Sequence, residues 1–271
     1  MRGLRNLSLA LCFLYSCRDQ QKEAAADVPA PDAVPVLNYS VRRVFPHDTT
    51  LYTEGLVFHA NRLFESSGSD ANYPQTRSII GIDDFRSGKV EKKVELDKSS
   101  YFGEGIVFLK DRLYQLTYRN HTGFIYDART YRRVDSFRFQ NAEGWALTTD
   151  SNSLIMSDGT SKLTYLDPVS LKPTRVLAVT VGGTPLDSLN ELEYIDKYIY
   201  ANRFTQNYVV KIDPASGKVV GKIDLSALVE EEKNRNPMCD VLNGIAYDPV
   251  GDKIYVTGKL WAQIYEIAFS H

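Results

Sequence analysis

Five polar side chains recur along this chain, and each stands directly before a short apolar run. They are Glu54, Glu104, Glu143, Asn190 and Asn243, spaced 39 to 53 residues apart. Carboxylates and amides are groups that carry protons, orient polar substrates or bind cations. If the fold brings all five together, three carboxylates share one site. That arrangement is costly unless one of them is protonated, paired with a cation or bound to a metal.

Each of these leading residues opens a repeated unit of sequence. A polar turn and a second apolar run follow the first run, and a third run ends in an acid 23 to 29 residues after the leader. The runs are short, rich in Val, Ile, Tyr, Phe and Thr, and separated by Gly, Pro and Asp. Such repeats are typical of β-propellers, in which one repeat makes one four-stranded blade. We therefore predict an all-β fold with five blades.

The fifth repeat stops at the chain end after its third run, so it lacks an outer strand. Residues 40–45 resemble the outer run of the fourth repeat, residues 218–223. We expect this N-terminal strand to close the fifth blade, because closure removes the open sheet edge between the first and last blades. The inner runs would then carry the five leading residues to one mouth of the central channel. Lys259 is a candidate counter-charge for the acids there.

The N-terminal segment differs from the rest of the chain. Two arginines precede an apolar run at residues 7–15, which has the length of a signal-peptide core and is too short to span a bilayer. The run leads into Leu14-Tyr15-Ser16-Cys17, which resembles a bacterial lipobox with Cys17 as the lipidated residue. A plain secretory signal is the alternative interpretation.

The domain boundaries follow from this segment. Residues 1–17 are expected to be a lipoprotein-type signal peptide, residues 18–38 a flexible tether rich in Ala and charge, and residues 39–271 the propeller. We expect an exported protein held by lipid on a bacterial membrane, on its periplasmic side or at the cell surface. The formal net charge of −2 over 271 residues offers no basic field for nucleic acid.

Several motifs together resemble the glutaminyl cyclotransferases of the plant and bacterial type, over residues 40–269. They are Phe45-Pro46-His47-Asp48, Tyr52-Thr53-Glu54-Gly55-Leu56, Glu143-Gly144-Trp145-Ala146-Leu147, Met156-Ser157-Asp158-Gly159, Leu189-Asn190-Glu191-Leu192 and Thr257-Gly258-Lys259-Leu260-Trp261. The resemblance implies a five-bladed propeller, in agreement with the repeat count. It also implies an acyltransferase that converts the N-terminal glutamine of a peptide to pyroglutamate and releases ammonia.

The resemblance also assigns roles. It implies that Glu104 is the catalytic carboxylate and that Glu54, Asn190 and Lys259 are polar substrate-binding groups. The aromatic wall of the substrate site falls on Tyr52, Tyr118, Trp145 and Phe204. The family usually has Gln at the position of Glu54 and Trp at those of Tyr118 and Phe204. A carboxylate at Glu54 would raise the pKa of Glu104 by charge repulsion.

The cyclisation reaction requires few catalytic groups. One carboxylate between the two nitrogens can take a proton from the attacking amine and give one to the departing ammonia. We therefore expect no metal in catalysis, although a structural Ca²⁺ in the central channel is compatible with the ring of Glu and Asn residues. The expected partners are peptides with N-terminal glutamine, bound by a monomer. Two alternatives are a metal-dependent, lactonase-like propeller hydrolase and a propeller that binds a partner without catalysis.

Overall fold

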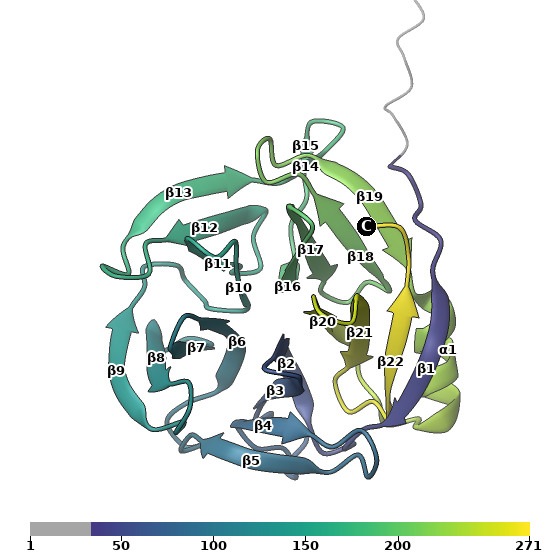
Figure 1. The fold of residues 1–271 in the computed structure, drawn as a ribbon, viewed down its shortest axis with the longest axis horizontal. Coiled ribbons are helices and arrows are strands. Elements are labelled where there is room, and N and C mark those ends of the chain that lie inside the picture. Colours follow the sequence, from purple (N-terminus) through teal and green to yellow (C-terminus); the bar gives the residue numbers. More distant parts are fainter. Residues whose placement is uncertain (1–33) are drawn as a thin grey trace, which may run out of the picture. The chain divides into compact units, whose positions relative to one another are not determined.

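The computed structural model describes residues 34–271, which form five four-stranded antiparallel sheets around a central axis (Figure 1). The first two blades are β2 (Tyr52–His59), β3 (Arg62–Gly68), β4 (Ile79–Asp83) and β5 (Val90–Glu95), then β6 (Gly103–Leu109), β7 (Arg112–Thr117), β8 (Thr122–Asp127) and β9 (Arg133–Arg138). The third blade is β10 (Leu147–Thr149), β11 (Leu154–Met156), β12 (Lys162–Leu166) and β13 (Pro173–Ala178). The predicted signal segment and Cys17 lie outside the described residues.

The last two blades complete the ring. The fourth is β16 (Leu189–Ile195), β17 (Tyr198–Arg203), β18 (Tyr208–Ile212) and β19 (Val219–Asp224), and the fifth is β20 (Leu242–Asp248), β21 (Lys253–Gly258), β22 (Gln263–Ala268) and β1 (Ser40–Pro46). The all-β, five-bladed propeller expected from the repeats is confirmed. Each leading apolar run is continuous because the inner strand is covered on both faces: every residue of β6 is buried, whereas the outer strand β9 is mostly exposed.

The N-terminal strand closes the fifth blade, as the sequence predicts. β1 pairs antiparallel with β22 from Ser40 opposite Ala268 to Pro46 opposite Gln263. The ring of Phe45 packs on Phe85 of the first blade, with ring centroids 4.3 Å apart. The first and last strands of the described residues therefore meet in one sheet (Figure 1). The contact of Phe45 with Phe85 packs the seam between the last and first blades.

A buried ionic contact reinforces this seam directly after β1. The His47 ring bonds the Trp261 carbonyl of the fifth blade through Nδ1 (2.8 Å) and the Glu65 carboxylate of the first blade through Nε2 (2.8 Å). Burial alone lowers the pKa of His47, but the adjacent Glu65 charge outweighs it and raises the pKa to about 9. The imidazole is thus a cation at neutral pH, and it fixes the point at which the chain turns into β2.

Two elements lie outside the four-stranded blades. Helix α1 (Ser226–Arg235) has ten residues and lies between the fourth and fifth blades in the chain. Its buried Glu232 accepts hydrogen bonds from the Ala262 N–H and the Tyr265 hydroxyl, so contacts with the fifth blade stabilise it. The outer strand of the third blade ends at Ala178, and β14 (Thr180–Val181) and β15 (Thr184–Pro185) form a separate hairpin after it. Within residues 34–271 no helix is long and apolar enough to cross a membrane.

The closure can be tested by truncation. A chain that begins at residue 46 loses β1 and exposes the edge of β22, whereas a chain that begins at residue 34 keeps both strands. Five of the six paired positions between β1 and β22 are lost. At ~0.5–1.5 kcal/mol for each hydrogen bond we expect the free energy of unfolding to fall by about 3 kcal/mol or more. Urea unfolding of the two proteins measures this difference; equal midpoints would show that β1 does not support the ring.

Candidate active site

In four blades the leading polar residue lies at an irregularity in the pairing of the inner strand. The register between the inner and second strands shifts at Glu54 in β2, at Glu104 in β6, at Asn190 in β16 and at Asn243 in β20. Such bulges take a residue out of the ladder and redirect its side chain, and they are common beside active sites. The repeated polar residue in the sequence is therefore the bulged residue of an inner strand.

The third blade departs from the alignment predicted from the sequence. The matching position is held by Trp145, whose carbonyl accepts the Gly105 N–H (2.8 Å), and not by Glu143. Glu143 lies two residues earlier, and its carboxylate accepts the Trp145 indole N–H (2.9 Å) and the Arg119 Nε–H (3.0 Å). The prediction of three acids at the mouth is therefore wrong. In the first three blades, two acids and a tryptophan hold the leading positions.

Inner strands approach each other closely beside Glu104. A Cβ atom on Gly105 would lie 2.4 Å from the Cα of Ala146, and one on Gly55 would lie 2.9 Å from the Cα of Gly105. Neither distance is sterically possible, so glycine is required at both positions. The first three blades therefore hold Glu54, Glu104 and Trp145 close together around one mouth of the channel.

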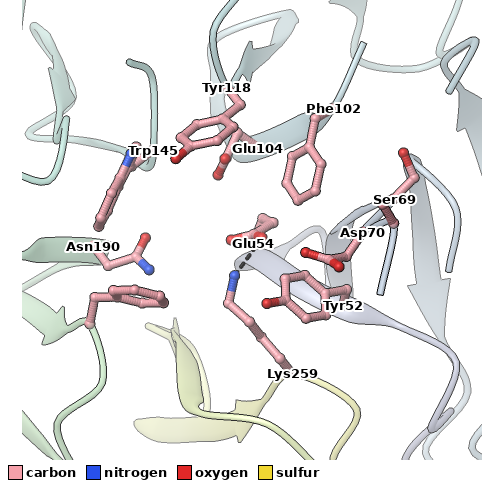
Figure 2. A pocket seen from close by; sticks show the side chains of 12 residues that line it. Tyr52, Glu54, Ser69, Asp70, Phe102, Glu104, Tyr118, Trp145, Asn190 and Lys259 are labelled. Atoms are coloured by element: carbon pink, nitrogen blue, oxygen red, sulfur yellow. Dashed lines mark ion pairs between the residues drawn. The ribbon is translucent and has the colours of Figure 1, made fainter. Parts of the chain in front are cut away.

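A cavity of about 400 Å³ opens at this mouth (Figure 2). All eight residues proposed from the sequence for catalysis and substrate binding line it: Tyr52, Glu54, Glu104, Tyr118, Trp145, Asn190, Phe204 and Lys259. Four lining residues were not proposed, namely Ser69, Asp70, Ala71 and Phe102. Three of these lie on the loop after β3, and the only sequence signal for them was the extra length of the first repeat. The volume suits a small peptide terminus rather than a whole folded partner.

Aromatic side chains form two walls of the cavity. Trp145 meets Phe204 edge-on with ring centroids 5.5 Å apart, and Phe102 lies between Tyr118 (5.8 Å) and Tyr52 (6.4 Å). Figure 2 shows the Glu104 carboxylate between Tyr118, Phe102 and Trp145. Such walls exclude water from an aliphatic chain bound between them and strengthen the electrostatic interactions inside.

Lys259 supplies the expected counter-charge. Its ammonium forms an ion pair with the Glu54 carboxylate, and both side chains are only 4% exposed. The same nitrogen lies 4.3 Å from the centroid of the Tyr52 ring. The Tyr52 hydroxyl in turn donates to Asp240 Oδ2 (3.1 Å), which keeps the ring in place beneath the ammonium. One cation therefore serves two buried acids, Glu54 and Glu104.

This shortage of positive charge determines where protons reside. Burial raises the pKa of Glu104 well above its ordinary value, and the Glu54 charge raises it further; Lys259 opposes the shift and Glu143 adds to it. Burial also raises the pKa of Glu54, to about 7, although Lys259 lowers it. Of the two acids, Glu54 has the Lys259 ammonium to stabilise its charge and Glu104 has no cation of its own, so Glu104 retains its proton to higher pH.

Asn190 offers an unused hydrogen-bonding atom in the cavity. Its side chain is 3% exposed, and its Oδ1 is buried without a hydrogen-bond partner within residues 34–271. Its backbone carbonyl accepts the Ser157 hydroxyl (2.8 Å), which fixes the strand beneath it. A buried acceptor without a partner is costly, so this oxygen is suited to an N–H donor from a bound ligand.

The channel below the mouth was a candidate Ca²⁺ site. Glu191 lies there, fully buried, and its carboxylate accepts the N–H groups of Leu56 (3.1 Å) and Ile245 (2.8 Å). Protein donors thus already bind both of its oxygens, and the Lys259 ammonium stands beside Glu54 at the mouth. These contacts disfavour a cation among the leading residues, and the structural Ca²⁺ stays a prediction.

Comparisons with known proteins agree on one family. A family model described as glutamine cyclotransferase matches residues 8–269. The chain is 40% identical over 225 residues to the glutaminyl-peptide cyclotransferase of Arabidopsis thaliana. The aligned region covers 82% of this chain and 68% of that protein. Its fold is similar to the crystal structure of Myxococcus xanthus glutaminyl cyclase, with a TM-score of 0.77 and 33% identity over 87% of this chain and 98% of that one.

The shared cation can be tested through stability. In Lys259→Met the Glu54 carboxylate stays buried without its partner, so we expect a loss of about 3–5 kcal/mol in unfolding free energy at pH 8. Burial raises the pKa of Glu54 in the folded protein above its value in the unfolded chain. The ionised carboxylate therefore destabilises the folded state, and this cost increases as the pH rises above the unfolded-state pKa. The loss should therefore be clearly smaller at pH 5.

The matched control is the double variant Glu54→Gln/Lys259→Met, which removes both charges and should recover most of the stability at pH 8. Urea unfolding of wild type and both variants at the two pH values gives the comparison. An equal loss at pH 5 and pH 8, or no recovery in the double variant, would contradict the ion pair as described.

Proposed function

The chain belongs to the glutamine cyclotransferase family, and from this premise we propose that Glu104 carries the proton in its reaction. The enzyme is a glutaminyl-peptide cyclotransferase, an acyltransferase that converts an N-terminal glutamine to pyroglutamate and releases ammonia. The observation that carries the proposal is the position of Glu104: a buried carboxyl in the cavity, beside a second acid, with one lysine for both.

The reaction needs one proton to move between two nitrogens. The substrate α-amine attacks the carbon of its own γ-carboxamide and forms a C–N bond. The Glu104 carboxylate accepts a proton from the attacking nitrogen and donates it to the amide nitrogen. The C–N bond to that nitrogen then breaks, and ammonia leaves. Glu104 ends in the state in which it began, so the step balances without another reactant.

A raised pKa at Glu104 favours these proton transfers. Most peptide α-amines enter as ammonium ions, which cannot attack. When the pKa of the carboxyl lies close to that of the amine, transfer of a proton from the ammonium to Glu104 costs little free energy. The neutral amine can then attack, the protonated Glu104 gives its proton to the amide nitrogen, and the carboxylate formed takes a proton from the attacking nitrogen. That last proton leaves with the ammonia as ammonium, so Glu104 returns to the carboxylate.

The remaining groups orient the substrate. The Asn190 amide and the Lys259 ammonium bring N–H donors to the cavity for the oxyanion of the tetrahedral intermediate. The Asn190 Oδ1, which accepts no hydrogen bond from residues 34–271, suits an N–H of the glutaminyl amine or amide. Tyr52, Tyr118, Trp145 and Phe204 surround the aliphatic part of the side chain. Because attack is intramolecular, holding the cyclising conformation supplies much of the rate.

Two further proposals concern cofactor and assembly. We propose catalysis without a metal ion, because Glu104 supplies the proton transfers and the Lys259 ammonium stands where a cation would bind Glu54. We also propose that a monomer is the working unit, since one chain brings every group that the mechanism uses to the cavity.

Replacement of the proton carrier gives the main test of this mechanism. Glu104→Gln keeps size and shape but cannot carry the proton, so we expect kcat to fall by about 10²–10⁴ with little change in KM. The control is Glu143→Gln, the same substitution at an acid beside the mouth whose carboxylate is held by Trp145 and Arg119. It should retain most of the activity. Ammonia release from a Gln-initiated dipeptide amide measures all three proteins.

A near wild-type rate in Glu104→Gln would exclude Glu104 as the proton carrier. If a chelator then abolished the wild-type rate, the metal-dependent hydrolase would become the better description of the site.

The Glu54 charge should shift the pH dependence of kcat/KM. Glu54→Gln removes the charge that raises the pKa of Glu104 and leaves Lys259 to lower it. Deprotonated Glu104 then persists to lower pH, so the acidic limb of kcat/KM should move downward while activity is retained. Profiles from pH 5 to pH 9 measure the shift, and an upward displacement would contradict the electrostatic account.

For localisation, we propose that Cys17 is lipidated and anchors an exported enzyme to a bacterial membrane. The support is the sequence of residues 1–17 alone, which lies outside the described residues. Cys17→Ser should move the protein from the membrane fraction to the soluble fraction of cells, whereas Cys12→Ser, in the same segment, should not. Unchanged membrane association of Cys17→Ser would disprove the anchor.

A further inference from the structure

The loop after β3 is longer than its counterparts in the other blades. Residues 69–78 join β3 to β4, whereas residues 118–121, 157–161, 204–207 and 259–262 make the same connection elsewhere. Internal hydrogen bonds order the loop: the Asp70 N–H donates to Thr76 Oγ1 (2.8 Å), and the Thr76 hydroxyl donates to the Tyr73 carbonyl (2.7 Å). The Tyr73 ring packs against Tyr52, with centroids 5.6 Å apart. The extra residues are thus fixed against the cavity wall.

This loop brings a carboxylate to the cavity that the proposed mechanism does not use. Asp70 lines the cavity, and Figure 2 shows its carboxylate beside the Tyr52 ring on the side opposite Trp145 and Asn190. Asp70 Oδ1 accepts the Asn72 N–H (2.7 Å). Within residues 34–271 no basic side chain forms an ion pair with Asp70. The group is half-buried, so it can meet a ligand that extends from the cavity toward solvent.

The charges around Asp70 do not balance. Asp240 lies on the same side, where its Oδ2 accepts the Tyr52 hydroxyl. Among the described residues that line the cavity, the one cation is Lys259, which is already paired with Glu54. On the opposite wall, by contrast, Glu143 is neutralised by Arg119. The fields of Asp70 and Asp240 act on the site itself: both raise the pKa of Glu54 and of Tyr52. One side of the cavity mouth is therefore net negative.

A bound peptide must pass this side. Asn190 is 3% exposed and its Oδ1 accepts no hydrogen bond from residues 34–271, which indicates independently that the cavity binds an N–H-bearing ligand at its inner end. With the reacting glutamine there, beside Glu104, the rest of the peptide leaves through the mouth. We propose that Asp70 and the loop 69–78 form an acidic subsite that binds a lysine or arginine side chain on one of the two residues after the N-terminal glutamine. This inference rests on the proposed function.

The test compares peptides that differ only in charge. The substrates are Gln-Lys-Ala-amide, Gln-Ala-Lys-amide, Gln-Ala-Ala-amide and Gln-Glu-Ala-amide, and the measurement is kcat/KM for pyroglutamate formation at low ionic strength. For wild type we expect the better lysine peptide to exceed the glutamate peptide by about fivefold or more, since an ion pair near the surface contributes a few tenths to one kcal/mol and a like charge opposes binding.

Asp70→Asn keeps the size and the Asn72 contact but removes the charge, so the lysine-to-glutamate ratio should fall to about half its wild-type value or lower. Asp135→Asn, at an exposed position of β9 away from the cavity, should keep the wild-type ratio. Added salt should reduce the ratio in wild type more than in Asp70→Asn.

The outcomes separate the two proposals. Equal ratios in wild type and Asp70→Asn, with all four peptides cyclised, would overturn the acidic subsite and leave the cyclase function standing. Failure of wild type to cyclise Gln-Ala-Ala-amide would overturn the proposed function, and the subsite with it.

Discussion

A single ammonium group serves two buried carboxylates at the mouth of the channel. Lys259 pairs with Glu54, and both are almost completely shielded from water. Glu104 shares the same enclosed volume without a cation of its own, so its pKa lies well above that of a free glutamate. A carboxyl in that state can both accept and donate a proton near neutral pH. The chemistry of the site depends on this imbalance more than on any one contact to a substrate.

The propeller makes the imbalance possible by bringing charged residues from distant parts of the chain to one axis. Glu54, Glu104 and Lys259 come from the first, second and fifth blades. The distances between these residues are fixed only when the ring of blades is closed. The pairing of β1 with β22 closes the ring, and His47 links the two blades at the seam through Trp261 and Glu65. The glycines beside the acids let the inner strands approach to within backbone contact. Stability at the seam and geometry at the site are therefore linked.

The fold and most of the cavity could be predicted from the sequence because each blade repeats one pattern of polar residue and apolar run. The prediction was wrong for the third repeat, because Glu143-Gly144 has the same sequence as Glu104-Gly105 while Trp145 holds the structurally matching position. Helix α1 could not be foreseen from periodicity, because its buried Glu232 is stabilised by Ala262 and Tyr265. Asp70 was missed for a related reason: a loop without a pattern becomes a cavity wall only through its contacts with Thr76 and Tyr52.

The most direct measurement is a titration of the Glu104 carboxyl itself. Protein with ¹³C-labelled glutamate side chains can be followed by NMR from pH 4 to pH 9, with the Glu104 signal assigned by its disappearance in Glu104→Gln. The account predicts a midpoint well above the ordinary glutamate value of 4.5. A midpoint at or below 4.5 would mean that Glu104 is a simple anion at neutral pH, and the proposed proton transfer would have no physical basis.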